Sequence, residues 1–336
     1  MQSSVESSGY FENFSSDLDD YDLEEDDFFS SNISFNGRLV ISGEPSVWPV
    51  LGTGGRGTVF LPEDTSSDCE DEDQTDSICR GHGISVGADP RNIKFEVFST
   101  RIREGKRKQS VFYSLMVLRT DGIDLDKAII ERRYSDFAAL HKALKKDHPS
   151  LLEKVTFPGK VFGQKSNLNP EVIEARRSAF ESFLQKIYHH KEVCLHPAFR
   201  EFFFLPELRE ATENLKGGEL KRSLKLLLNS LHLQVKLCDQ VREIIATLSA
   251  IVVVHEAQSK FEEAECYANV ALELIQEGNF SSYLIPLMDT AVKLKRNLQK
   301  DKKALEKRLA QAQRTSGIDV DCAFTLRELA VTRFDK

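Results

Sequence analysis

The sequence predicts an α+β protein in which a three-stranded antiparallel sheet with helices precedes an all-α domain. Residues 91–205 contain three short runs rich in β-branched and aromatic residues, followed by segments with helical apolar spacing. After Pro206, apolar residues recur at helical spacing almost throughout. Residues 1–90 mix Ser, Gly, Asp and Glu without a sustained period. We therefore expect a disordered acidic tail before two folded domains, 91–205 and 206–336.

Charge is distributed unevenly along the 336 residues. Residues 1–90 carry 20 acidic and 3 basic side chains, residues 91–205 carry 14 and 22, and residues 206–336 carry 19 and 20. The middle region has a net charge of +8 although the whole chain has −8. Such a region faces phosphate in a membrane or a nucleic acid, or is simply well solvated. Within the tail, the segment "DLDDYDLEEDDFF" has three possible roles. It could bind a partner protein, mimic an anionic ligand of the basic region within the same chain, or only keep the chain soluble.

Several classes of protein lack their sequence signals here. No apolar stretch approaches the ~20 residues of a membrane span, and no signal peptide is expected. Six scattered cysteines without a C-x-x-C pair indicate reduced thiols in a cytoplasmic protein, without a metal or cofactor. No catalytic motif is found, so we expect no enzyme. The segment "GTGGRGTV" has the spacing of a kinase glycine-rich loop, but V-A-I-K, H-R-D and D-F-G are absent.

Three strands are predicted in order along the middle region. They are "IKFEVFSTRI", "SVFYSLMVL" and "KAIIERRY", separated by "REGKRKQ" and "RTDGIDLD". The second connection contains Asp121-Gly122, a pair that favours a tight turn. These short connections predict an antiparallel meander.

The apolar period then changes to that of a helix. Phe137, Leu140 and Leu144 share one face of "SDFAALHKALKK", for which Ser135 is the expected N-cap. Pro170 is expected at the first position of a second helix, "PEVIEARRSAFESFLQKIY". The irregular stretch "TFPGKVFGQKSNLNP" joins the two, and a short helix, "HPAFREFFFL", closes the region.

Residues 206–336 contain five segments with helical apolar spacing. Their short connections, including "KGG" and "AQS", favour antiparallel neighbours. In "KFEEAECYANVALELI", alanines on the apolar stripe allow a second helix to approach closely. The pattern resembles a tetratricopeptide-type helical hairpin, although no period of about 34 residues repeats.

The basic region carries side chains suited to a phosphorylated sugar. "ERRYSDF" places Arg132 and Arg133 against a tyrosine at a strand-to-helix junction, and neighbouring strand residues point to opposite faces. An arginine fork binds phosphate through charge-assisted hydrogen bonds, while a flat aromatic side chain can stack on a ring. "PGK" adds Lys160 on a loop. Arg176 of "EARRSAF" lies within the apolar stripe of its helix, where a charge points into a cleft or snorkels out of it.

These three motifs, in this order after three strands, resemble the phox-homology (PX) domain of sorting nexins over about residues 92–205. The resemblance implies binding of phosphatidylinositol 3-phosphate. By position, it assigns the 3-phosphate to Arg133 and the platform under the inositol ring to Tyr134, with Ser135 in the same contact segment. Arg132 would point elsewhere.

The same resemblance gives roles to residues farther along the chain. Lys160 would meet the 1-phosphate. Arg176 would bond the 4- and 5-hydroxyls, with Arg177 as the contender for that role. The loop is shorter than the proline-rich loop often found in the family, and Val161 and Phe162 are the residues expected to insert into the bilayer. Because the loop is short, a different phosphoinositide headgroup, such as the 4,5-bisphosphate, stays an alternative to the 3-phosphate as the ligand.

The helical region and the terminal "TLRELAVTRF" extend the resemblance to the sorting nexin-20 and sorting nexin-21 subgroup. This implies a PX-associated helical domain that binds protein cargo or effectors. We therefore expect a cytoplasmic adaptor, peripheral on early endosome membranes, without a nucleic-acid partner. One alternative is an interaction scaffold whose PX fold does not read phosphatidylinositol 3-phosphate. The other is a nucleic-acid binder, although no recognised motif for one is present.

Overall fold

The structure is a computed structural model that describes residues 92–334, with gaps at 106–108, 121–123, 125, 127, 162–166, 277–281 and 318–323. The acidic tail, the glycine-rich segment and Phe162 lie outside the described residues. The chain divides into two units, Met1–Cys69 and Glu70–Lys336, and every helix and strand named below belongs to the second. None of the helices described is both long enough and apolar enough to cross a membrane.

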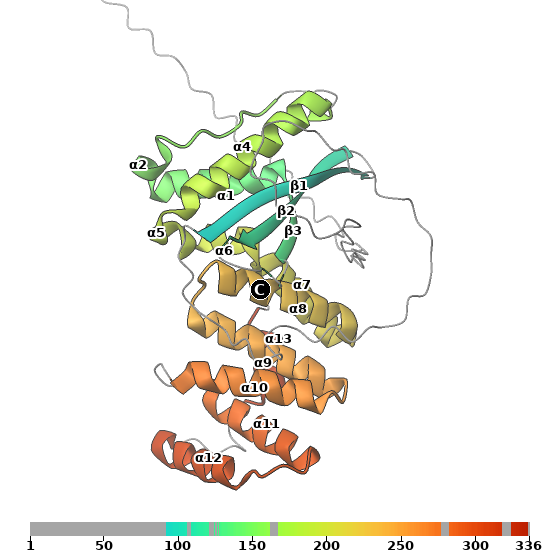
Figure 1. Ribbon diagram of the computed structural model, residues 1–336, viewed down its shortest axis with the longest axis vertical. Coiled ribbons are helices and arrows are strands. Elements are labelled where there is room, and N and C mark those ends of the chain that lie inside the picture. Colours follow the sequence, from blue (N-terminus) through green and yellow to red (C-terminus); the bar gives the residue numbers. More distant parts are fainter. Residues whose placement is uncertain are drawn as a thin grey trace, which may run out of the picture. The chain divides into compact units, whose positions relative to one another are not determined.

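The sheet is an antiparallel meander in the order β1-β2-β3, which confirms the prediction (Figure 1). Its strands are β1 (Ile93–Glu104), β2 (Gln109–Arg119) and β3 (Ala128–Arg133). The register places Arg101, Phe112 and Arg133 next to one another across the three strands. Because β1 and β2 continue past this row, their hairpin extends beyond the end of β3.

Helices follow the sheet, and the two longest of this region, α1 and α4, pack against it. They are α1 (Tyr134–Asp147), α2 (Pro149–Leu152), α4 (Pro170–Tyr188), α5 (Lys191–Cys194) and α6 (Pro197–Phe203). Phe137 of α1 stacks on Phe180 of α4 with ring centroids 3.8 Å apart. Both rings are fully buried, as expected for the predicted apolar stripes.

The start of α4 agrees with the prediction, whereas the start of α1 does not. α4 has Pro170 in its first turn. The N-cap of α1 is Arg133, so the prediction of Ser135 as the N-cap was wrong. The Asp136 carboxylate accepts the Arg133 backbone N–H at 2.7 Å, and this contact from within the first turn organises the helix start without a serine cap.

From Leu205 onward the described elements are all helices, as predicted. They are α7 (Leu205–Gly217), α8 (Leu220–Lys236), α9 (Val241–Ala257), α10 (Phe261–Gln276), α11 (Leu284–Asn297), α12 (Lys303–Ser316) and α13 (Leu326–Thr332). Each helix from α7 to α12 packs on the next. Gly218 ends α7 with φ of 83°, a left-handed conformation that would strain a residue with a Cβ atom.

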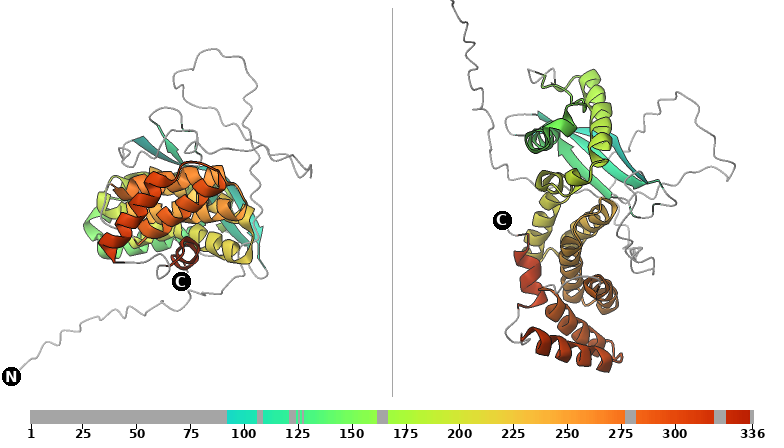
Figure 2. Two further views of the ribbon diagram at one scale, coloured as in Figure 1. Left: turned by 90° about the horizontal axis from the view of Figure 1, so that it is seen from below. Right: turned by 90° about the vertical axis from the view of Figure 1, so that its left-hand side faces the viewer.

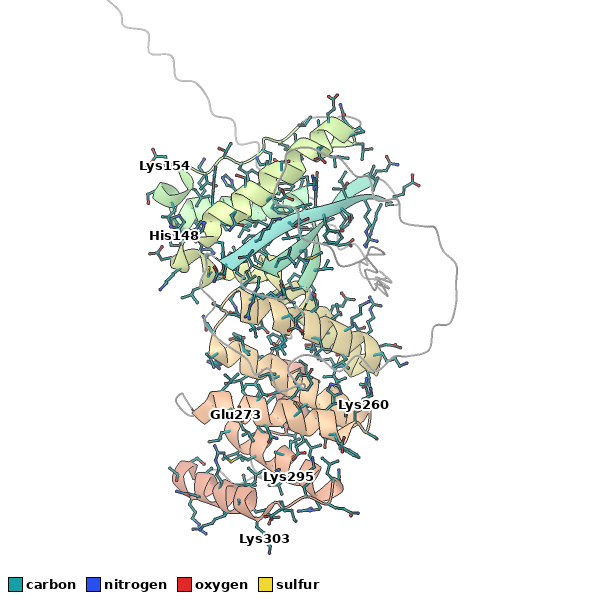
Figure 3. All side chains as sticks on the ribbon, viewed as in Figure 1. His148, Lys154, Lys260, Glu273, Lys295 and Lys303 are labelled. Carbon is teal, nitrogen blue, oxygen red and sulfur yellow. The ribbon has the colours of Figure 1, made fainter. Side chains whose placement is uncertain are left out.

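Contacts between neighbouring helices are both apolar and charged. Ala264, Ala268 and Ala271 of α10 are fully buried, and α10 packs closely on α9, which confirms the predicted close approach. Lys295 lies on α11 (Figure 3). Its Nζ pairs with Glu265 of α10, 2.8 Å from Oε1.

Helix α9 lies at the centre of the helical region. Every residue from Glu243 to His255 is buried, because α8, α10 and α13 all pack around this helix. No separate helix was predicted for the segment that forms α13. This helix, dark red near the C-terminus in Figure 2, contacts α7, α9 and α11. Leu326, Ala330 and Phe334 from its segment are buried.

One hydrophobic core runs through the sheet, the helices around it and the helices that follow. Helix α8 packs against both β2 and β3. The division of the folded chain into 91–205 and 206–336 stays a prediction, because the core continues across that boundary.

Candidate functional site

The predicted phosphate ligand, Arg133, is the last residue of β3 and directly precedes α1. Its side chain is 40% exposed, and its Nε lies 4.0 Å from Asp136 Oδ1. An exposed ion pair of this kind stabilises a protein by about 1 kcal/mol at most. A phosphate, which can accept two charge-assisted hydrogen bonds from a guanidinium, can therefore compete with Asp136 for Arg133.

The predicted platform, Tyr134, lies against Arg176 of α4. The Arg176 Cζ is 4.2 Å from the centre of the tyrosine ring, a cation–π geometry. Arg176 is only 4% exposed, and its Nη2 donates to Asn167 Oδ1 at 2.9 Å. Its buried Nε has no hydrogen-bond partner in the described part of the chain. The structure thus brings Tyr134 and Arg176 together and leaves one guanidinium donor unused.

The contender for the role of Arg176 is engaged elsewhere. Arg177 Nη1 donates to the Val97 carbonyl of β1 at 2.9 Å, and Nη2 lies 2.9 Å from Glu174 Oε1. The hydrogen bonds to Glu174 raise the pKa of Arg177. Arg177 therefore ties α4 to the sheet, while Arg176 is the arginine beside Tyr134.

The loop before α4 is held to the same junction by two residues. The Tyr134 hydroxyl donates to the Pro158 carbonyl at 2.9 Å. The Phe157 ring stacks on His141 at 4.5 Å and lies 6.0 Å from the Tyr134 ring, measured between centroids. Lys160 is exposed and follows Pro158 by two residues, so the Cα atoms of these two residues are at most about 7 Å apart. The structure thus places Lys160 on a loop that is anchored at the junction.

The other predicted residues occupy the edges of this region. Ser135 is exposed, and its hydroxyl donates to Asp136 Oδ1 at 3.3 Å. Val161 is half-buried, and the proposed second inserting residue, Phe162, is outside the described residues.

Burial shifts two ionisable groups near the junction. It raises the pKa of the Tyr113 phenol, an effect that the positive charge of Arg176 opposes. Burial also lowers the pKa of His141, and the charge of Lys145 adds to this. Both groups are therefore neutral at pH 7, so the positive charge of the junction comes from its arginines and Lys160.

Arg132 does point elsewhere, as the alternation along the strand predicted. It is 7% exposed and donates to the Phe202 carbonyl and to both carboxylate oxygens of Glu207. These partners of Arg132 were not predicted from the sequence. Neither was Asn167, the partner of Arg176, nor the role of Phe157, although an aromatic residue directly before "PGK" was a visible signal.

Comparison with known proteins adds family relationships to this geometry. The family model for the PX domain matches residues 122–205. Sorting nexin-20 of Bos taurus is 34% identical over 245 residues, which cover 72% of this chain and 76% of that protein. Sorting nexin-21 of Homo sapiens is 31% identical over 245 residues and is covered to 65%.

A solved structure also matches part of the chain. The X-ray structure of a designed CISK-PX domain is 25% identical, with a TM-score of 0.28, and the match covers 33% of this chain and 97% of that one.

Proposed function

Because the chain belongs to the sorting nexin family, we propose that it is a peripheral-membrane adaptor that binds phosphatidylinositol 3-phosphate. A PX domain in a sorting nexin implies a phosphoinositide-binding role in trafficking, and the family is not enzymatic. The proposal adds the lipid, the site, the early endosome as the membrane, and a protein cargo or effector for the helical region. It rests on one observation, the convergence of Arg133, Tyr134 and Arg176 at the junction of β3 and α1.

Each side chain has a task in this proposal. Arg133 exchanges its weak pairing with Asp136 for the 3-phosphate. Arg176 offers its unpaired Nε–H to a ring hydroxyl while it stays against Tyr134. Lys160 binds the 1-phosphate, beside the point where the lipid chains begin. Ser135 completes the contact segment at the helix start.

The surroundings of the site suit a membrane surface. Ile102 is 48% exposed on the hairpin that extends past Arg133, whereas its neighbours Arg101 and Arg103 point to the other face of the sheet, where both pair with Glu131. An exposed apolar side chain of this kind can insert at a membrane interface, and each cation near an anionic surface that has no carboxylate partner adds about 1 kcal/mol. We propose that this hairpin and Val161, with Phe162, contact the bilayer together. Salt should therefore weaken binding.

The test is sedimentation of the full chain with vesicles that contain phosphatidylinositol 3-phosphate. Arg133→Ala should weaken binding about tenfold to a hundredfold, since hydrogen bonds to a charged group contribute about 1.5–3 kcal/mol. Lys145→Ala removes the same charge from an exposed position at the far end of α1 and should have little effect. Equal binding of wild type and Arg133→Ala would exclude the headgroup site.

One observation favours the alternative, a protein-interaction scaffold whose PX fold does not recognise phosphatidylinositol 3-phosphate. Arg176 is 4% exposed and its unpaired Nε is itself buried, so a headgroup must displace Asn167 or other neighbouring groups to reach any of its donors. Sedimentation with vesicles that contain phosphatidylinositol, its 3-phosphate or its 4,5-bisphosphate distinguishes the proposed function from the scaffold. Binding to the 3-phosphate alone supports the proposal, preference for the 4,5-bisphosphate changes the lipid, and uniform binding supports the scaffold.

A further inference from the structure

Arg132, the residue before the proposed phosphate ligand, is a buried cation that a later helix neutralises. Its Nη1 and Nη2 donate to Glu207 Oε1 and Oε2 at 2.6 and 2.8 Å, and its Nε donates to the Phe202 carbonyl at 2.6 Å. Burial opposes its charge, but Glu207 outweighs this, and the pKa of Arg132 rises. Glu207 lies in α7, beyond the last residue matched by the PX family model, residue 205. The acid that neutralises Arg132 therefore comes from the helical region.

Helix α8 holds the same part of the sheet through its polar side chains. Asn229 accepts the Ile129 N–H and donates to the Ile129 carbonyl, each at 2.9 Å, and so takes the place of a neighbouring strand at the edge of β3. One face of α8 continues to Lys236, which donates to the Val117 carbonyl at 3.1 Å and pairs with Asp124 at 2.7 Å. The helical region thus contacts β3 along its length.

We propose that Arg132 and Glu207 are positioning residues, through which the helical region sets the geometry of the headgroup site. The inference rests on the proposed function. Glu207 fixes Arg132, and the peptide bond that follows carries the Arg133 N–H, which donates to Asp136. A displacement of α7 therefore changes the direction of the Arg133 side chain and the start of α1.

This arrangement couples two binding events. A protein that shifts α7 when it binds the helical region changes the affinity for the lipid, and the lipid changes the affinity for that protein by the same factor. The chain then responds to cargo and membrane together.

The first experiment uses the full chain and a soluble short-chain phosphatidylinositol 3-phosphate, titrated by calorimetry well below the unfolding temperature. Glu207→Gln removes the charge but keeps one acceptor for Arg132, and affinity should fall about fivefold or more. Glu213→Gln is the matched control, since Glu213 is an exposed carboxylate on the same helix, α7. Affinity equal to wild type in Glu207→Gln would overturn the inference.

A double variant separates positioning from stability. Arg132→Met with Glu207→Leu replaces a buried ion pair by apolar side chains, a change that often keeps a protein folded. We expect the unfolding temperature to recover relative to either single variant, while the affinity for the lipid stays low. If affinity returned together with the unfolding temperature, the pair would be structural only.

A readout without lipid separates this inference from the proposed function. Amide hydrogen exchange of the segment with Arg133 and Asp136 should become faster in Glu207→Gln than in Glu213→Gln. If wild type failed to bind the lipid, the proposed function would fail. Unchanged exchange in Glu207→Gln would instead reject the positioning role.

Discussion

Two neighbouring arginines at the end of β3 lie in opposite environments. Arg132 is 7% exposed and pairs with a carboxylate, whereas the Arg133 side chain is 40% exposed. Successive side chains of a strand point to opposite faces, which accounts for the difference. A single peptide bond thus connects a residue bound to the protein core with one that faces solvent and can meet a ligand.

His141 gives this region a pH dependence. Burial and the charge of Lys145 lower its pKa, and its ring stacks on Phe157 of the loop. Between this lowered value and the ordinary 6.5, the unfolded chain binds more protons than the folded one. Stability should therefore fall as the pH drops below about 6.5.

The measurement is thermal unfolding between about pH 7.5 and pH 5.5. His141→Phe keeps a flat ring on Phe157 and removes the titration. The loss of unfolding temperature should be smaller in this variant than in wild type, because the contribution of His141 is removed. An identical loss would show that His141 does not contribute.

At the scale of elements, the short helix α13 completes the burial of α9. Phe334 is 6% exposed, and Phe334→Ala should lower the free energy of unfolding by about 3–5 kcal/mol, the usual cost of truncating a buried phenylalanine. Phe324, just before the helix, is 70% exposed, and Phe324→Ala should stay within about 0.5 kcal/mol of wild type. Urea unfolding compares the two, and equal effects would contradict the assignment of α13 to the core.

The elements that sequence could predict are those with a long, regular apolar pattern. The three strands, α1, α4 and the helices around α10 all show one. α13 spans only seven residues, and its apolar residues Leu326, Leu329, Ala330 and Val331 form too short a run to separate from a loop. The cap of α1 was assigned to Ser135 because serine is a frequent N-cap, but Asp136 organises that turn instead.

The candidate site was predictable only as far as its residues lie in local motifs. Arg133, Tyr134, Lys160 and Arg176 come from such motifs, and their roles toward a lipid stay predictions. The partner of Arg132 was not predictable, because Glu207 is 75 residues away and nothing in "LPELREA" marks it as an ion-pair partner.

At the scale of the whole molecule, the sheet and the helical region depend on one another. A fragment of residues 91–205 lacks Glu207, so Arg132 must either stay buried without a carboxylate, at a cost of about 3–5 kcal/mol, or turn out to solvent and lose its hydrogen bonds. It also lacks the helix that covers the edge of β3. We expect residues 91–336 to unfold in one calorimetric transition at a clearly higher temperature than this fragment.

A fragment of intermediate length is the control. Residues 91–217 restore Glu207 but not Asn229, so their stability should lie between the other two. Equal unfolding temperatures for all three would show that the regions are energetically independent.

The closure of the core by α13 affects how the chain folds during synthesis. Helix α9 is apolar around most of its circumference, yet the last segment that covers it ends only at Phe334. At roughly 5–20 residues per second, α9 leaves the ribosome several seconds before that segment exists. During this interval an exposed apolar helix is open to aggregation. We therefore expect the nascent chain to need chaperone protection from the moment α9 emerges until α13 is complete.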